Sequence, residues 1–156
     1  MKIQTILAAL AALCIPAAAL ADAGHSHGDE RAYGQPGDPK KPARIVQVTM
    51  READGRMEFV PRTIEARKGE QVKFVLRNNG AIDHEIVVAT LAENLKHAEE
   101  MRKNPDMEHE DPNARRLAPR ETGEMVWKFT KAGEFDFSCL IPGHREAGMT
   151  GKIIVK

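Results

Sequence analysis

The sequence has little cysteine, no excess of either charge and no internal repeat. Its 156 residues include two cysteines and one tryptophan, and 23 basic side chains balance 23 acidic ones. This balance argues against a nucleic-acid-binding or membrane-surface protein, because both need a basic excess. The sequence also lacks a motif that pairs a nucleophile with a base, which argues against a hydrolase.

Residues 1–21 are expected to form a cleaved secretory signal peptide. Lys2 precedes an uncharged stretch rich in Ala, Leu and Ile, Ile3–Leu20, and small residues follow it. Such a basic start, short apolar core and small-residue exit are typical of export signals, and cleavage fits after Ala21 or Ala23. The alternative is a transmembrane anchor, but the apolar run is at the short limit for a bilayer and no basic cluster follows it. The compact signal indicates a bacterial periplasmic protein with no membrane association after cleavage.

Removal of the signal peptide leaves Cys139 as the only thiol. Cys14 departs with the leader, so Cys139 cannot form an internal disulfide. A lone thiol in an oxidising compartment needs another role, and metal ligation is a leading one. The 135 residues that remain after removal of 21 from 156 are enough for one domain with a hydrophobic core.

The rest of the chain divides into an arm and a β-rich domain. Residues 22–43 combine Gly, Pro, His and charge, which predicts a flexible N-terminal arm. In the domain, residues 44–156, short segments alternate apolar and polar positions and are separated by turns such as Asp54-Gly55. Seven to eight short strands of this kind predict an antiparallel β-sandwich. The segments expected as strands are 45–50, 57–60, 63–66, 72–76, 84–89, 125–129, 135–139 and 153–155.

One segment, residues 90–120, breaks the strand pattern. Thr90 and Glu93 form a capping box, and a helical stripe of apolar residues follows and ends before Pro105. Residues 104–120 are charged and rich in proline. We therefore expect an insert that consists of one helix and an irregular excursion. The expected buried stripe is Leu91, Leu95, Ala98 and Met101.

The most informative motif is C-x4-H-x4-M, formed by Cys139, His144 and Met149 between two predicted strands. A loop of this length can turn all three side chains toward one point. Soft sulfur ligands with imidazole suit copper, and two histidines, one cysteine and a weak axial methionine form the blue-copper arrangement. Among the other histidines, only His84 begins a predicted strand, so we assign it as the second imidazole. The sequence thus predicts one copper ion, bound by His84, Cys139, His144 and Met149.

Each of these residues also has an ordinary structural interpretation. A histidine at a strand start is usually structural, and a lone strand cysteine usually packs as a small hydrophobe. The joint spacing, with Pro142-Gly143 directly before the histidine, favours the metal site over four unrelated residues. A dinuclear copper centre would need two cysteines in this loop, and only Cys139 is present.

These motifs resemble the type 1 copper sequence of cupredoxins. The resemblance is carried by Gly133, Phe135, Phe137 and Cys139 at alternate positions, then by Pro142-Gly143-His144, Met149 and Gly151. It covers residues 44–156 apart from the insert and implies a Greek-key β-sandwich. The ligand spacing is similar to that of rusticyanin and auracyanin, and the arm and insert resemble periplasmic cupredoxins linked to bacterial copper tolerance. In one departure, Glu85 follows His84, where many small cupredoxins have an asparagine that ties the two ligand loops together.

Further histidines and methionines lie outside this motif. His25 and His27 are close to the expected new N-terminus, where they either bind Cu(II) or are incidental residues of a solvated arm. In the insert, many glutamates surround the remaining candidates, which favours a solvated surface over a second copper site. Those candidates are His97, Met101, Met107 and His109.

The predicted chemistry is a one-electron cycle between Cu(II) and Cu(I). Two roles fit it: copper tolerance and homeostasis, which the additional histidines and methionines favour, or a mobile electron carrier between periplasmic proteins. A redox partner would dock near His144, where an apolar rim is expected from Ile82, Ile141, Pro142 and Ala147. An enzyme is not expected, apart from a weak cuprous-oxidase-like activity, because full ligation leaves no open metal position.

Overall fold

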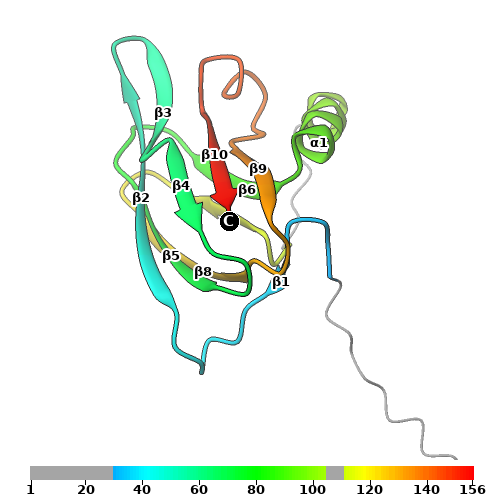
Figure 1. Ribbon diagram of the computed structural model, residues 1–156. Coiled ribbons are helices and arrows are strands. Elements are labelled where there is room, and N and C mark those ends of the chain that lie inside the picture. Colours follow the sequence, from blue (N-terminus) through cyan, green and yellow to red (C-terminus); the bar gives the residue numbers. More distant parts are fainter. Residues whose placement is uncertain (1–29, 105–110) are drawn as a thin grey trace, which may run out of the picture.

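The computed structural model describes residues 30–104 and 111–156, which form two five-stranded sheets packed face to face (Figure 1). The first sheet contains, in spatial order, β1 (Gln35–Pro36), β8 (Thr122–Lys128), β5 (Gln71–Asn78), β2 (Arg44–Ala53) and β3 (Arg56–Val60). The second contains β4 (Thr63–Ala66), β10 (Thr150–Val155), β9 (Gly133–Ser138), β6 (His84–Ala89) and β7 (Ala114–Leu117). The helix α1 spans Leu91–Lys103. The expected β-sandwich with one helix is confirmed.

The sheets are mixed, so the expectation of a purely antiparallel sandwich is wrong. β2 pairs in parallel with β5, with Val46 opposite Phe74, and β4 pairs in parallel with β10, with Ile64 opposite Ile153. The reason is the path of the chain, which leaves the first sheet after β3, enters the second as β4 and returns beside β2 as β5. Two of the ten strands, β1 and β7, were also not expected.

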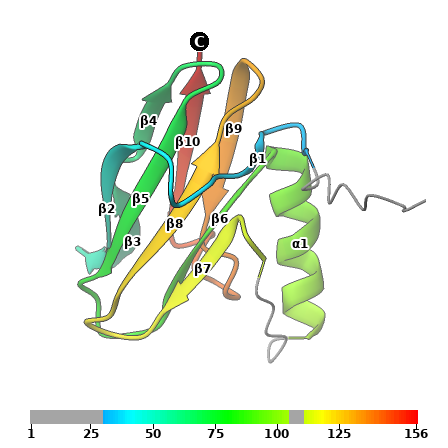
Figure 2. The same ribbon diagram turned by 90° about the horizontal axis from the view of Figure 1, so that it is seen from below.

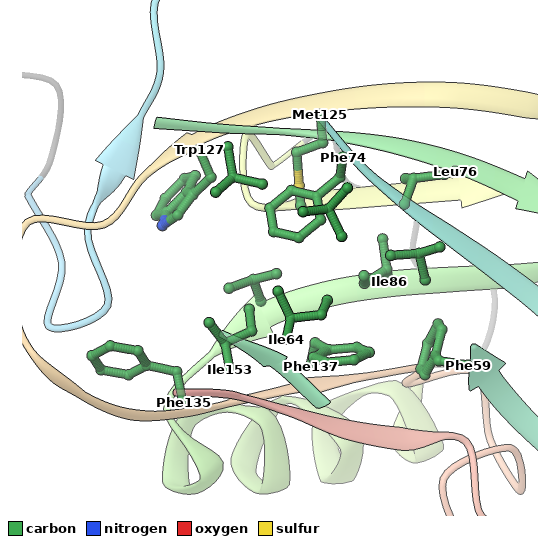
Figure 3. Close-up of a cluster of buried hydrophobic side chains, with 14 of the residues drawn as sticks. Phe59, Ile64, Phe74, Leu76, Ile86, Met125, Trp127, Phe135, Phe137 and Ile153 are labelled. Atoms are coloured by element: carbon green, nitrogen blue, oxygen red, sulfur yellow. The ribbon is translucent and has the colours of Figure 1, made fainter. Parts of the chain in front are cut away.

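The core lies between the two sheets and follows from the period-two pattern of the strands. In β5, for example, Val72, Phe74 and Leu76 are fully buried, while their neighbours in the chain are partly or fully exposed. Figure 3 shows side chains from both sheets meeting in this layer, with Phe59 and Phe137 in edge-to-face contact at 5.1 Å between ring centroids. This packed layer supports the loops at the ends of the sandwich.

Part of the expected flexible arm is folded against the sandwich. Tyr33 is 1% exposed, and its ring stacks on Trp127 with centroids 5.5 Å apart. The indole nitrogen of Trp127 donates to the carbonyl oxygen of Tyr33 at 2.9 Å, and β1 then pairs with β8. Composition thus hid one aromatic residue of the expected arm that the core takes in. The expected signal peptide, His25 and His27 lie outside the described residues.

The capping box of α1 is confirmed, but only the second half of the expected apolar stripe, Ala98 and Met101, packs against the sandwich. The Glu93 amide donates to Thr90 Oγ1 at 3.2 Å, and the Thr90 amide donates to the Glu93 carboxylate at 3.1 Å. Leu91 and Leu95 are 53% and 51% exposed. The buried residues are Asn94 and Met101.

The hydrogen bonds of Asn94 explain why this face of the helix, and not the face with Leu91 and Leu95, lies against the sheet. Its amide donates to the carbonyl of Val87 at 3.0 Å and to the carboxylate of Asp136 at 2.7 Å. α1 consequently runs along the outer face of the second sheet beside β9 and β6 (Figure 2), and β6 is buried on both faces. No helical segment among residues 30–104 and 111–156 is long and apolar enough to cross a membrane.

The expected irregular excursion contains a strand. Ala114–Leu117 forms β7, which pairs with β6 so that Leu117 lies opposite His84. β7 therefore covers the edge of β6 at His84, where the candidate site begins.

Candidate metal centre

Three strands of the second sheet bring the predicted ligands to one end of the sandwich. His84 is the first residue of β6, Cys139 directly follows β9, and Met149 directly precedes β10. β6 and β9 are antiparallel neighbours, so the start of β6 lies beside the end of β9. The amide of Cys139 donates to the carbonyl of Met149 at 3.1 Å, which closes the base of the loop.

A tight turn directs His144 back toward the sandwich. The His144 amide donates to the carbonyl of Ile141 at 3.0 Å, and Gly143 has φ of 88°. A turn of this kind favours proline at its second position and needs glycine at its third, which is the Pro142-Gly143 sequence. The Met149 amide then donates to the His144 carbonyl at 3.1 Å. The loop sequence thus holds the His144 imidazole near the point where Cys139 and Met149 are hydrogen-bonded to each other.

Three donor atoms meet at this point. Nδ1 of His84 and Nδ1 of His144 are 3.2 Å apart, and Cys139 Sγ is 3.2 Å from Nδ1 of His144. All three donor atoms lie within 4.8 Å of one another, and the described residues offer no other such group of three His, Cys, Asp or Glu. Because metal–imidazole bonds are about 2.0 Å long, two nitrogens at this separation can contact one ion.

The donors are shielded from solvent to different degrees. His84, Cys139 and Met149 are completely buried, whereas His144 retains 8% exposure. Met149 belongs to the same core cluster as Cys139. Among the four predicted ligands, only His144 therefore reaches the surface.

Burial also sets the protonation of the donor side chains. It raises the pKa of the Cys139 thiol to about 12, although the amide of Glu85 at 3.4 Å from Sγ acts in the opposite direction. Burial and the neighbouring His84 lower the pKa of His144 below its ordinary value. His144 is therefore a neutral imidazole ready to bind a metal, while Cys139 must release a proton to become a ligand.

Glu85 ties the two ligand segments together. Its amide contacts Cys139 Sγ, and its carboxylate accepts a hydrogen bond from the Leu140 amide at 3.0 Å. The residue is only 5% exposed. The Glu85 carboxylate thus connects the two ligand segments, in place of the asparagine that the sequence lacks at this position.

Sequence reasoning missed Glu52, which contacts a predicted ligand. Its Oε1 lies 2.7 Å from His84 Nε2, and its Oε2 accepts from the Ala81 amide at 2.9 Å. Burial acts to raise the pKa of Glu52, but these hydrogen bonds outweigh it and the pKa lies below its ordinary value. A signal was present, because strand alternation places Glu52 on the same inward face as Val48 and Met50.

Of the other metal-ligand candidates, the structure describes only Met101 and His97. Met101 is 1% exposed and packs with Val87 and Leu140 beneath α1, so it is part of the core. His97 is half-buried on the same helix. Met107 and His109, like His25 and His27, lie outside the described residues.

Comparison with known proteins agrees with this geometry. Residues 46–156 match the model of the copper binding proteins of the plastocyanin/azurin family. The chain belongs to this family. It is 50% identical to the copper-resistant cuproprotein CopI of Rubrivivax gelatinosus over 94% of this chain and 95% of that protein. It is 32% identical to CopI of Pseudomonas aeruginosa over 96% of this chain and 95% of that protein.

A solved auracyanin from Roseiflexus castenholzii shares the fold, with a TM-score of 0.61 and 17% identity over 74% of this chain and 99% of that one. The plastocyanin/azurin family binds copper, and the residues present here fit that metal. Two imidazoles and one thiol converge in a buried site, which is the donor set of type 1 copper. The predicted copper cofactor and cupredoxin fold are confirmed.

Proposed function

We propose that this protein is a periplasmic cupredoxin that binds one type 1 copper ion and acts in copper tolerance. The proposed ligands are His84, Cys139, His144 and, as a weak axial ligand, Met149. The observation that carries the proposal is the convergence of three donor atoms from two distant chain segments. The tolerance role is supported by relatives named copper-resistant cuproproteins, which this chain matches over almost its whole length.

The chain's own residues would hold the ion in a preformed pocket. The hydrogen bonds from Cys139 to Met149 and from Leu140 to Glu85 fix both ligand segments before the ion arrives. Burial of His84 and Cys139 excludes water from the donors. Bound copper would supply one-electron transfer between Cu(II) and Cu(I), and a rigid donor set suits both states because it requires little rearrangement.

Loading the purified protein with Cu(II) tests the metal centre. We expect one copper per chain and an intense visible absorption from charge transfer between thiolate and copper, because the blue-copper donor set contains a thiolate. Cys139→Ala should lose this absorption. Met101→Leu is the matched control, because it removes a buried sulfur that packs away from the donors. A colourless wild-type protein would refute the assignment.

A second candidate function is that of a mobile electron carrier. It is favoured by exposed apolar residues on the two ligand loops, since Ile82 is 41% exposed and Pro142 is also exposed. Ile141 and Ala147, which belong to the same loop as Pro142, are half-buried. An apolar rim of this kind suits a redox partner that docks near His144.

Growth of a strain that lacks the gene distinguishes the two functions. For a tolerance protein, we expect sensitivity to added copper with normal respiration, restored by the wild-type gene but not by Cys139→Ala. A respiratory defect at trace copper would instead support the carrier.

Mass spectrometry of the periplasmic fraction of the complemented strain tests export and cleavage after Ala21 or Ala23.

The additional copper ligands are a separate proposal. Copper stoichiometry should be measured for the mature protein, for a variant without residues 22–29, and for a variant in which His97, Met107 and His109 are replaced. A fall toward one copper per chain would support auxiliary sites, whereas an unchanged value of one would rule them out.

A further inference from the structure

We infer that Glu52 is a positioning residue of the copper centre, which fixes the tautomer of His84 and favours Cu(II) over Cu(I). The inference deepens the proposed function and rests on it, because it takes His84 as a copper ligand. It concerns a carboxylate on β2, outside both ligand segments.

The two nitrogens of His84 face different partners. Nδ1 lies 3.2 Å from His144 Nδ1 in the donor cluster, whereas Nε2 lies 2.7 Å from Glu52 Oε1. A carboxylate accepts hydrogen bonds, so Nε2 carries the hydrogen and Nδ1 keeps its lone pair. The hydrogen bond on the outer nitrogen of an imidazole ligand commonly selects the tautomer and ring orientation in this way.

The carboxylate is itself held in place. Its second oxygen, Oε2, accepts from the Ala81 amide at 2.9 Å. Gly80 packs directly against the same group, and a Cβ atom at position 80 would clash with Oε1. Although 32% of the Glu52 side chain is exposed, both oxygens are engaged, Oε1 by His84 and Oε2 by the Ala81 amide. The partner of His84 is therefore a fixed negative charge rather than a mobile surface group.

A fixed negative charge on the outer nitrogen changes the balance between the two oxidation states. It makes the imidazole a stronger donor, and it stabilises the more positive ion most. His84 is completely buried, so water screens the interaction less than it would at an open surface. The ratio of Cu(II) affinity to Cu(I) affinity should thus be higher than with a neutral partner.

A purely structural role for Glu52 makes a different prediction. Glu52 also supports the loop before β6 through Ala81, so any replacement is expected to lower stability. Support of the loop alone would not change the preference for one oxidation state. The reduction potential therefore separates the two roles.

The experiment compares Glu52→Gln with Asp83→Asn in the copper-loaded protein. Asp83 directly precedes His84 and has the same charge, but it pairs with Arg116 at 3.1 Å instead of the imidazole. We expect Glu52→Gln to lower the ratio of Cu(II) to Cu(I) affinity at least tenfold, which raises a one-electron potential by about 59 mV. Asp83→Asn should change the ratio less than about threefold, because its charge is exposed and screened. Equal shifts in both variants, or no shift in Glu52→Gln, would overturn the inference.

A second measurement uses the wild-type protein and does not depend on the folding of a variant. In the diamagnetic Cu(I) form, nitrogen-15 NMR should show a slowly exchanging proton on Nε2 of His84. A His84 ring without a proton on Nε2 would also refute the inference. If the wild-type protein fails to develop the copper–thiolate absorption, the proposed function itself fails, whereas normal absorption with an unchanged Glu52→Gln potential refutes only the role of Glu52.

Discussion

At the residue scale, the thiol of Cys139 links copper-free stability to pH. Burial raises its pKa to about 12 in the folded protein, compared with about 8.5 for an unfolded cysteine. Between these values the folded state keeps the proton and the unfolded state loses it. The thiol's contribution to stability is therefore complete below the unfolded pKa and decreases as pH rises toward the folded pKa.

We expect the copper-free protein to lose stability above about pH 8.5 relative to Cys139→Ala, with a slope of about 1 kcal/mol per pH unit. Urea denaturation of both proteins at pH 7, 9 and 10 gives this difference, and subtraction cancels the other titrating groups. If the two stability curves stay parallel over this range, the thiol is not shielded as described.

Residues of the site differ in how well the sequence predicts them. The convergence of Cys139 and His144 was predictable because one short loop contains both, and that of His84 because it begins a strand, whereas Met149 as a ligand stays a prediction. Glu85 was flagged only as a departure from the family, and its hydrogen bond to Leu140 needed the structure. Glu52 was missed because its contact with His84 joins two strands that lie in different sheets.

At the element scale, α1 connects the insert to the ligand loop. Asp136 on β9 accepts hydrogen bonds from Asn94 of α1 at 2.7 Å and from Arg145 at 2.9 Å. Arg145 directly follows His144, and the Arg145–Asp136 ion pair is largely buried, with side chains 16% and 11% exposed. The helix therefore supports the outer side of the loop that carries His144.

Two substitutions on α1, one at a buried and one at an exposed position, should differ strongly in their effect on stability. Met101→Ala is expected to destabilise the protein by about 2–5 kcal/mol, because it leaves a cavity against Val87 and Leu140. Leu95→Ala should change stability by less than about 0.5 kcal/mol, since Leu95 is 51% exposed. Urea denaturation measures both, and a similar loss for the two variants would contradict the observed face of the helix.

Local sequence patterns predicted where the strands and the helix lie better than they predicted which strands pair with each other. The period-two alternation located most strands, and the capping box located the start of α1, because both signals lie within a few residues. The parallel partners of β2 and β4 were not predictable, since pairing depends on where the chain crosses between sheets. The expected burial of Leu91 and Leu95 was wrong, because the hydrogen bonds of Asn94 turn a neighbouring face of the helix toward the sheet, whereas Ala98 and Met101 of the same stripe pack as expected.

At the scale of the whole molecule, the metal would join parts of the sandwich that the chain keeps far apart. His84 begins β6, while Cys139 and His144 belong to the connection between β9 and β10. An ion that binds all three stabilises only the folded state, because the unfolded chain does not bring them together.

We therefore expect copper to raise the unfolding temperature, with a gain of about 4 kcal/mol at a free copper concentration one thousand times the dissociation constant. Calorimetry with and without copper measures the gain, and His84→Ala should lose most of it. An equal gain in His84→Ala would show that copper stabilises the protein at another place.

The parallel pairing of β4 with β10 has a consequence for biogenesis. Ile64 finds Ile153 only after the intervening chain is available, and contacts between such distant segments form slowly. Until β10 docks, the Cys139 sulfur is open to oxidants, and overoxidised sulfur can no longer serve as a thiolate. We therefore expect slow pairing of β4 with β10 to lower the yield of copper-competent protein when oxidants are present.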